Sequence, residues 1–366
     1  MFIDRRYFRY FDWLSFGITV LLACLSLLFV FSATYRPEQP YSLFFKKQLI
    51  GFCTGLIVYF VFASIDYRSL TRFGYFMYFG VLILLAFTII KGSIGMGAQR
   101  WINLGVIKFQ PSELVKLFLP AFITYYFYTQ KDIPSFTWKD FTTPLIVLCI
   151  STFLVLKQPD LGTAIIIFAL GMLMFWIAGL SRWFFIGGLI LFLVSAPLSW
   201  NMLKDYQKKR IAVFLGYGDS KNERYQIEQS KISIGSGGLT GKGFLQGTQN
   251  KLAFLPESRT DFIFSVVAEE WGFVGTCILL LLYLILFIHL LLVIRELPFF
   301  ELLLATGLLT HIGLSTLINV GMVIGLLPIV GIPLPLMSYG ISHTWITLAS
   351  LGWLNGIIVR RFYIGT

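Results

Sequence analysis

One carboxylate occupies a place in the sequence where a general base would be useful. Asp261 follows a glycine-rich stretch and directly precedes a long apolar run, so its side chain should lie at the boundary between water and an apolar layer. A carboxylate in such a place stays ionised and is still selective in taking a proton, which suits general base catalysis. The alternative is that Asp261 caps the first turn of the following helix.

The neighbouring carboxylates indicate what reaction a single base could serve. Glu257 lies four residues before Asp261 and would share a face with it if this stretch is helical. Glu269 lies about 12 Å further along a helix. That separation is too long for the carboxylate pair of a retaining glycosidase. The pattern therefore favours one base and an inverting displacement.

The stretch before Asp261 could bind an anion. Glycines are dense between residues 235 and 247, and glycine-rich turns can expose successive backbone N–H groups to an anion. The nucleotide-binding P-loop pattern fails, because it needs a glycine and a hydroxyl where the chain has Ser236 and Gly243. Lys242 and Arg259 favour a phosphate ligand, and the alternative is a flexible surface loop.

Charged residues within apolar stretches form a second group of candidates. Glu113 and Lys116 are three residues apart, which places both on one helix face, and either charge would be costly in lipid without a partner. We expect them to pair inside the protein, as a structural pair or as part of a binding site. Arg100 and Lys108 precede this helix as further cations. Asp160 opens another helix, where it could cap or bind.

A membrane-embedded bundle of helices must position these residues. Of the 366 residues, 57% are hydrophobic and only 13% are charged, with a mean hydropathy of +0.79. Soluble domains carry about 25% charge, so a water-soluble globule is excluded. A spanning helix needs about 20 apolar residues. Ten segments qualify: 12–33, 46–64, 73–90, 113–130, 141–157, 161–179, 183–201, 265–294, 300–323 and 339–358.

Ten spans place both termini on one side of the membrane. The count of Lys and Arg in the short loops favours the cytoplasm for that side. The polar segment 202–262 then forms one large external loop, where most of the candidate chemistry lies. The fold class predicted is an all-α polytopic membrane protein with ten transmembrane helices in a single domain, 1–366.

Several other kinds of site are not expected. The net charge of +11 is spread over many short connections, whereas nucleic-acid binding would gather it on one domain. The four cysteines and three histidines are isolated and lack the spacing of a zinc or haem site. The segment 340–344 misses the last glycine of a lipase elbow, so a serine nucleophile is rejected. Prolines at 328, 333 and 335 exclude one straight helix there.

Five motifs, in chain order, resemble the SEDS family of bacterial cell-wall proteins (shape, elongation, division and sporulation). They are GAQRWINLG, FQPSELVKL, QPDLGTA, the run from QIEQSKISIG to SVVAEE, and NVGMVIGLLPIVGIPLPLMSYG. The similarity spans nearly the whole chain. The short termini resemble the elongation branch of that family more than its division branch. The chain departs from the usual pattern where it reads PIVG at 328–331 and SYGISH at 338–343, in place of PVTG and SYGGSS.

The resemblance implies a glycosyltransferase that polymerises lipid II, the undecaprenyl-pyrophosphate-linked disaccharide-pentapeptide, into glycan strands at the outer leaflet of the bacterial inner membrane. Asp261 in TDFIF matches the family's essential aspartate. Glu113 and Lys116 match the polar pair of its PSELxKL helix, and Asp160 matches its QPDLGT aspartate. The other substrate-binding candidates are Arg100, Lys108, Lys242, Arg259, Glu257 and Ser338.

The resemblance also implies partners. A class B penicillin-binding protein would act as the transpeptidase, beside other membrane proteins of the elongation complex. Cations should stabilise the departing pyrophosphate, with Mg²⁺ or Mn²⁺ as the expected cofactor and no organic cofactor.

Two other functions stay open at this point. A lipid II flippase would also use ten helices and an intramembrane Glu113/Lys116 pair, and a scaffold that recruits the transpeptidase would not need Asp261. The polar residues gather on one side and no inverted repeat is visible in the sequence, which favours the enzyme.

Overall fold

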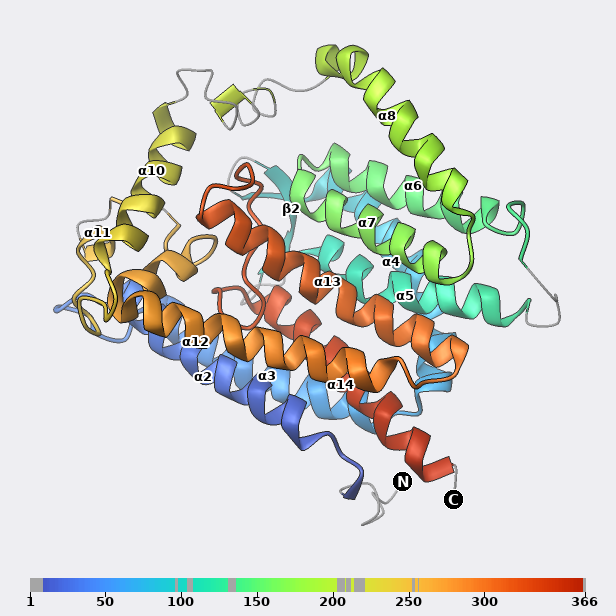
Figure 1. Cartoon of the computed structure of the whole chain (residues 1–366), viewed down its shortest axis with the longest axis horizontal. Helices are drawn as coiled ribbons and strands as arrows, with labels where there is room; N and C mark the ends of the chain where they lie inside the picture. The colour runs from blue at the N-terminus through green and yellow to red at the C-terminus, as the bar shows by residue number, and fades with distance from the viewer. Residues whose placement is uncertain are drawn as a thin grey trace.

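Long helices form the body of the protein (Figure 1). The computed structural model describes residues 9–95, 98–103, 108–130, 136–202, 208, 212–213, 221–251, 254–255 and 257–364. Its helices are α2 (Trp13–Thr34), α3 (Leu43–Ser64), α4 (Tyr67–Lys91), α5 (Pro111–Tyr128), α6 (Thr142–Lys157), α7 (Leu161–Ile177), α8 (Arg182–Met202), α10 (Lys221–Ser236), α11 (Thr248–Lys251), α12 (Ile263–Ile294), α13 (Phe299–Val323) and α14 (Ile341–Ile364).

The predicted fold class is confirmed, because each of the ten predicted spans coincides with one of these helices. Five of them, α2, α3, α4, α12 and α13, are long and apolar enough to cross a membrane, and α6, α7 and part of α8 are shorter apolar helices. Their outward faces carry many exposed large apolar side chains, which is the pattern of a surface that faces lipid. The protein is therefore membrane-embedded.

Local sequence explains where several helices begin. The side chain of Asp12 accepts a hydrogen bond from Ser15 N at the start of α2, and Ser42 accepts one from Phe45 N at the start of α3. Each caps an otherwise unpaired N–H group. α5 begins with Pro111, whose missing N–H costs nothing at the first helical position.

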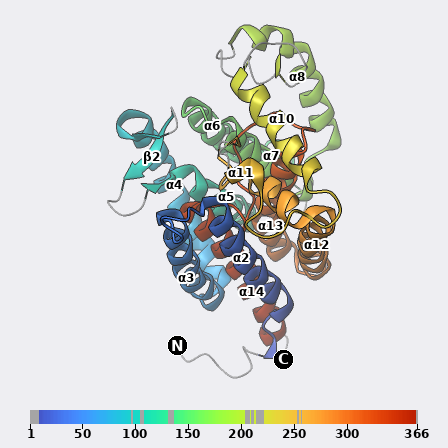
Figure 2. The ribbon, with the colours of Figure 1, turned by 90° about the vertical axis from the view of Figure 1, so that its left-hand side faces the viewer.

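Helix α5 lies at the centre of the bundle. It packs against α4, α6, α7, α13 and α14, and fourteen of its eighteen residues are buried. Charged residues on this helix consequently face protein and do not face lipid. α8 lies at the periphery in both views (Figures 1 and 2).

The expectation of an all-α chain misses one small feature. β1 (Ser93–Gly95), β2 (Ala98–Asn103) and β3 (Lys108–Phe109) form an antiparallel three-stranded sheet between α4 and α5. The segment expected as a large loop, 202–262, also contains helices α10 and α11. The strands and α11 are short and α10 is polar, so none of them belongs to the apolar runs from which the spans were predicted.

Helix α12 is interrupted at Gly272, where the glycine-rich segment packs against it. Gly272 has φ +66°, which breaks the helical path there. Lys242 N and Gly243 N donate to the carbonyl groups of Glu269 and Glu270, and Phe273 N donates to Gly238 O. A Cβ on Gly241 would lie only 2.1 Å from Glu270 O. The glycines therefore allow close packing against α12. Several of the N–H groups expected to cradle an anion, among them those of Gly241, Lys242 and Gly243, are already bonded to protein.

Candidate active site

Asp261 lies in the turn that leads into α12, and the residue that caps this helix is Phe262. The alternative of Asp261 as the helix cap is therefore not what the structure shows. Its side chain is partly buried, and a Cβ added to Gly331 would lie 3.5 Å from Asp261 Oδ2. The carboxylate thus faces the non-helical segment between α13 and α14.

Asn319 ties the backbone of Asp261 to that same segment. Its Nδ2 donates to Asp261 O at 2.8 Å and to Ile332 O at 2.7 Å, and the side chain is fully buried in α13. One amide therefore holds together the turn that contains Asp261 and the segment that faces its carboxylate. Asn319 is not among the residues predicted from the sequence. The signal that could have found it is an amide inside an apolar helix, where a polar group needs a buried partner.

Ser338 holds the turn before Asp261 from the other side. Its hydroxyl donates to Thr260 O and accepts from Leu334 N, while Tyr339 N donates to Arg259 O at 2.9 Å. Ser338 is 1% exposed. Its hydroxyl is enclosed and used by two backbone groups, and its expected role in binding substrate stays a prediction.

Two polar residues from the first two spanning helices complete this support, and neither was predicted from the sequence. Gln48 Nε2 donates to Ser338 O at 3.1 Å, and Ser26 Oγ donates to Met337 O at 2.7 Å. Gln48 lies within α3 and Ser26 within α2. A polar side chain inside an apolar helix could have indicated each of them, because it needs a buried partner.

Asp160 reaches the same region from α7. Its Oδ1 caps that helix by accepting from Thr163 N, and its Oδ2 accepts from Gln110 Nε2 at 2.7 Å and lies 3.4 Å from Arg100 Nη1. A Cβ on Gly162 would lie 2.9 Å from Val330 O. The start of α7 is therefore packed against the segment that faces Asp261, and Asp160 serves as both a cap and an anchor for Arg100.

Arg100 and Arg259 are the cations best placed to meet an anion. Arg100 is 19% exposed, and its buried Nε has no hydrogen-bond partner among the described residues. Arg259 is 33% exposed, lies 4.0 Å from Glu257 Oε2 and stacks 4.1 Å above the ring of Phe44. Glu257 itself accepts from Thr260 Oγ1. Of Lys108, only the backbone in β3 is described.

Glu113 and Lys116 form a fully enclosed pair, as the expectation of mutual pairing requires. Lys116 Nζ lies 2.7 Å from Glu113 Oε1, and His343 Nδ1 lies 3.1 Å from Glu113 Oε2. Lys116 is 1% exposed. His343 stands at one of the positions where the chain departs from the usual SYGGSS pattern, and it joins α14 to α5. Lys116 is too enclosed to touch a substrate in this conformation.

Lys242 is bound to protein as well. Its Nζ lies 2.6 Å from Glu269 Oε1, which also accepts from Thr248 N, Thr248 Oγ1 and Gln249 N. Glu269 thereby organises the glycine-rich segment. Lys242, which was expected to bind phosphate, is thus held in an ion pair that fixes this segment on α12.

Comparisons with known proteins identify the family of this chain. The profile of the FtsW/RodA/SpoVE cell cycle proteins matches residues 12–361. The chain belongs to the FtsW/RodA/SpoVE family. It is 38% identical over 348 residues to the peptidoglycan glycosyltransferase MrdB of Escherichia coli K12, covering 94% of this chain and 93% of that protein. It is 34% identical to MrdB of Helicobacter pylori J99, in a match that covers 100% of this chain and 94% of that protein.

Solved structures show the same relationship. A chain from a study of how a peptidoglycan synthase complex coordinates polymerization and crosslinking matches with a TM-score of 0.80 and 30% identity, covering 96% of this chain and 98% of that one. The rod shape determining protein RodA of Thermus thermophilus matches with a TM-score of 0.70 and 28% identity over the same shares. The predicted family, which includes these FtsW/RodA/SpoVE proteins, is confirmed.

Removing the Asn319 amide should impair catalysis more than stability. In Asn319→Leu, the Asp261 and Ile332 carbonyls lose their donor, so the carboxylate is no longer held in one place. Misplacement of a catalytic group by about 1 Å can cost about 100-fold in rate, and we expect a loss of about 10- to 100-fold in glycan polymerisation at a thermal midpoint within a few degrees of the wild type.

The matched control for this variant is Ser315→Ala, one turn earlier on α13. The Ser315 hydroxyl is buried and has no hydrogen-bond partner among the described residues. This control should keep its activity. Equal activity in Asn319→Leu and the wild type would show that Asn319 does not position Asp261.

Neutralising Glu269 should loosen the glycine-rich segment. Glu269→Gln replaces an oxygen that accepts from four donors and leaves Lys242 without its ion pair, so we expect a loss of about 2 kcal/mol in stability. The thermal midpoint and the rate of limited proteolysis between residues 237 and 251 measure it. The exposed Glu228, paired with Arg224 on α10, supplies the control, because Glu228→Gln should change stability by less than about 0.5 kcal/mol. Equal midpoints for the two variants would contradict the organising role of Glu269.

Proposed function

We propose that this protein is a peptidoglycan glycosyltransferase that polymerises lipid II into β-1,4-linked glycan strands during cell-wall elongation. The observation that carries the proposal is the partly exposed Asp261 carboxylate, which faces Gly331 while Asn319 and Ser338 fix the backbone on both sides of it. The names of the MrdB relatives support the activity.

Asp261 would act as the general base. It removes the proton from the 4-hydroxyl of the acceptor N-acetylglucosamine while that oxygen attacks C1 of the donor N-acetylmuramic acid. The C1–O bond to undecaprenyl pyrophosphate breaks, and the configuration at C1 inverts. One carboxylate suffices, because the leaving diphosphate is already a stable anion and needs no proton from an acid.

Positive charge must stabilise the departing diphosphate. Arg259 is two residues from Asp261 and Arg100 is anchored beside the start of α7, and both are partly exposed. We assign the diphosphate to these two arginines. Lys116 and Lys242 support the site indirectly, through the ion pairs that hold α5 and the glycine-rich segment.

A metal ion fits this site only with help from the substrate. Among the described residues, no group of three His, Cys, Asp or Glu side chains could hold one. Mg²⁺ often takes one or two carboxylates and completes its shell with phosphate oxygens and water. Glu257 is the partly exposed carboxylate available for this, and a bound Mg²⁺ or Mn²⁺ would neutralise charge on the diphosphate.

The setting of the reaction follows from the same reasoning. We propose that the protein lies in the bacterial inner membrane with both termini in the cytoplasm, so that Asp261 faces the outer leaflet. A class B penicillin-binding protein is the proposed transpeptidase partner, beside other membrane proteins of the elongation complex. The likeness to a chain described with a peptidoglycan synthase complex supports the first of these partners.

Polymerisation of purified lipid II in detergent tests the activity. No leaflets exist there, so a flippase has nothing to move lipid between, and a scaffold makes no product. Ladders of glycan strands on a gel would support the enzyme. Their absence, with the protein folded and its transpeptidase partner added, would refute it.

A further inference from the structure

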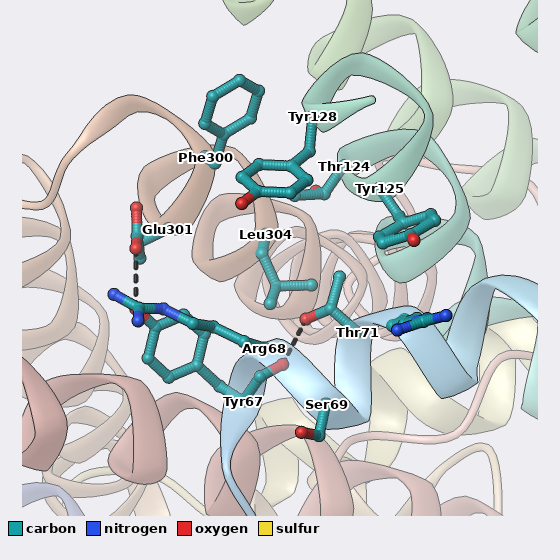
Figure 3. A pocket seen from close by; sticks show the side chains of 11 residues that line it. Tyr67, Arg68, Ser69, Thr71, Thr124, Tyr125, Tyr128, Phe300, Glu301 and Leu304 are labelled. Carbon is teal, nitrogen blue, oxygen red and sulfur yellow. Dashed lines mark hydrogen bonds between the residues drawn. The ribbon is translucent and has the colours of Figure 1, made fainter. Parts of the chain in front are cut away.

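A pocket of about 520 Å³ opens between α4, α5 and α13 (Figure 3). Tyr67 and Arg68 come from the start of α4, Thr124 and Tyr128 from the end of α5, and Phe300 and Glu301 from the start of α13. Glu301 and Asn319 lie on the same helix and are separated by about 27 Å at 1.5 Å per residue. The pocket is therefore at the opposite end of the bundle from the candidate active site.

The charge of the lining favours an anion. Two arginines, Arg68 and Arg72, line the pocket with a single carboxylate, Glu301. Glu301 accepts a hydrogen bond from the Tyr67 hydroxyl at 2.7 Å, and that hydroxyl accepts from Arg68 Nε at 3.1 Å. The carboxylate is thus engaged by Tyr67. Arg72 is exposed and makes no ion pair among the described residues.

Thr124 adds a hydroxyl group to the lining of the pocket. The side chain lines the pocket and is 4% exposed, yet its Oγ1 has no hydrogen-bond partner among the described residues. A buried hydroxyl without a partner costs free energy that a ligand oxygen would recover.

The surface beside the pocket is suited to acyl chains. Phe76, Phe79 and Ile83 follow Arg72 on α4 at intervals of four, seven and eleven residues, so all four share one helix face. Phe76 is 60% exposed and Ile83 is 71% exposed. A ligand held at Arg72 would therefore have an apolar stripe running from it into the membrane.

We propose that this pocket binds the phosphate-bearing headgroup of an anionic phospholipid. Arg72 and Arg68 hold the phosphate, Thr124 donates a hydrogen bond, and the acyl chains lie along the Phe76–Phe79–Ile83 face of α4. Because the pocket and Asp261 lie at opposite ends, the lipid is distinct from the substrate of the proposed reaction, and it would fix the packing of α4 against α5 and α13.

Native mass spectrometry of the purified protein in detergent tests this site. The ligands are dioleoyl-phosphatidylglycerol, dioleoyl-phosphatidylcholine and inorganic phosphate, and the readout is lipid bound per protein. We expect phosphatidylglycerol to bind more tightly than phosphatidylcholine. Arg72→Gln should weaken it by about tenfold, the worth of one charge-assisted hydrogen bond, and Thr124→Val should weaken it by about threefold.

The control is Arg295→Gln, which removes an exposed arginine at the same end of the bundle but outside the pocket, and it should change binding by less than about twofold. Unchanged binding in both Arg72→Gln and Thr124→Val would overturn the site. Equal binding of the two lipids would overturn the requirement for an anion. Displacement of the lipid by inorganic phosphate at equal concentration would show a site for the free anion and not for a lipid.

Discussion

Replacement of Asp261 by asparagine is expected to abolish glycan polymerisation while leaving the protein folded. Asparagine has the same shape but cannot take a proton, and loss of a general base typically costs about 10²- to 10⁴-fold in rate. The Asp261 backbone carbonyl would still accept from Asn319, so the turn before α12 stays in place. The measurement is strand formation from lipid II in detergent, with elution on gel filtration as the check of folding.

Asp140 provides the matched control for this change. Its carboxylate is exposed and accepts hydrogen bonds from Thr137 N and Oγ1, which lower its pKa. Asp140→Asn should polymerise lipid II like the wild type. Glycan strands formed at the normal rate by Asp261→Asn would show that Asp261 is not the base. The proposed activity would still stand, because polymerisation by the wild-type protein tests it separately.

Replacement of Lys116 by methionine is expected to destabilise the protein strongly. The substitution leaves His343 as the remaining partner of the buried Glu113 carboxylate among the described residues. Breaking a buried ion pair from one side costs about 3 to 5 kcal/mol, because the other charge stays buried without compensation. The thermal midpoint in detergent and the yield of folded protein should both fall.

The double variant Glu113→Gln/Lys116→Met separates the structural from the functional role. It removes both charges at once, and replacing a buried pair by neutral groups is often close to neutral in stability. We expect most of the lost stability to return. A normal midpoint with lost turnover in Lys116→Met would instead show that Lys116 reaches the substrate in another conformation.

The sequence was a good guide to the helices and to the charged pair. Apolar runs of about 20 residues can be satisfied only as spanning helices, because backbone N–H and C=O groups must pair internally in lipid. Two opposite charges three residues apart on such a helix must meet for the same reason. Both requirements are local, so the ten spans and the contact between Glu113 and Lys116 followed without a structure.

The sequence was a weaker guide to the residues around Asp261. Lys242 was expected to bind a phosphate, yet its Nζ pairs with Glu269, 27 residues further along the chain. Ser338 was expected to bind substrate, yet its hydroxyl bonds to Thr260, 78 residues earlier. Asn319, Gln48 and Ser26 were passed over altogether. Each of these contacts joins elements that are far apart in the chain.

The amino-acid sequence by itself determined that this is a membrane protein with ten apolar spans and a carboxylate just before the longest of them. Only the tertiary structure decided which polar groups are used up in holding that carboxylate and which stay open to a ligand. The physical reason is that a buried hydrogen-bond partner is chosen by proximity in the folded bundle. Spacing along the chain fixes proximity within one helix, and packing between helices fixes the rest.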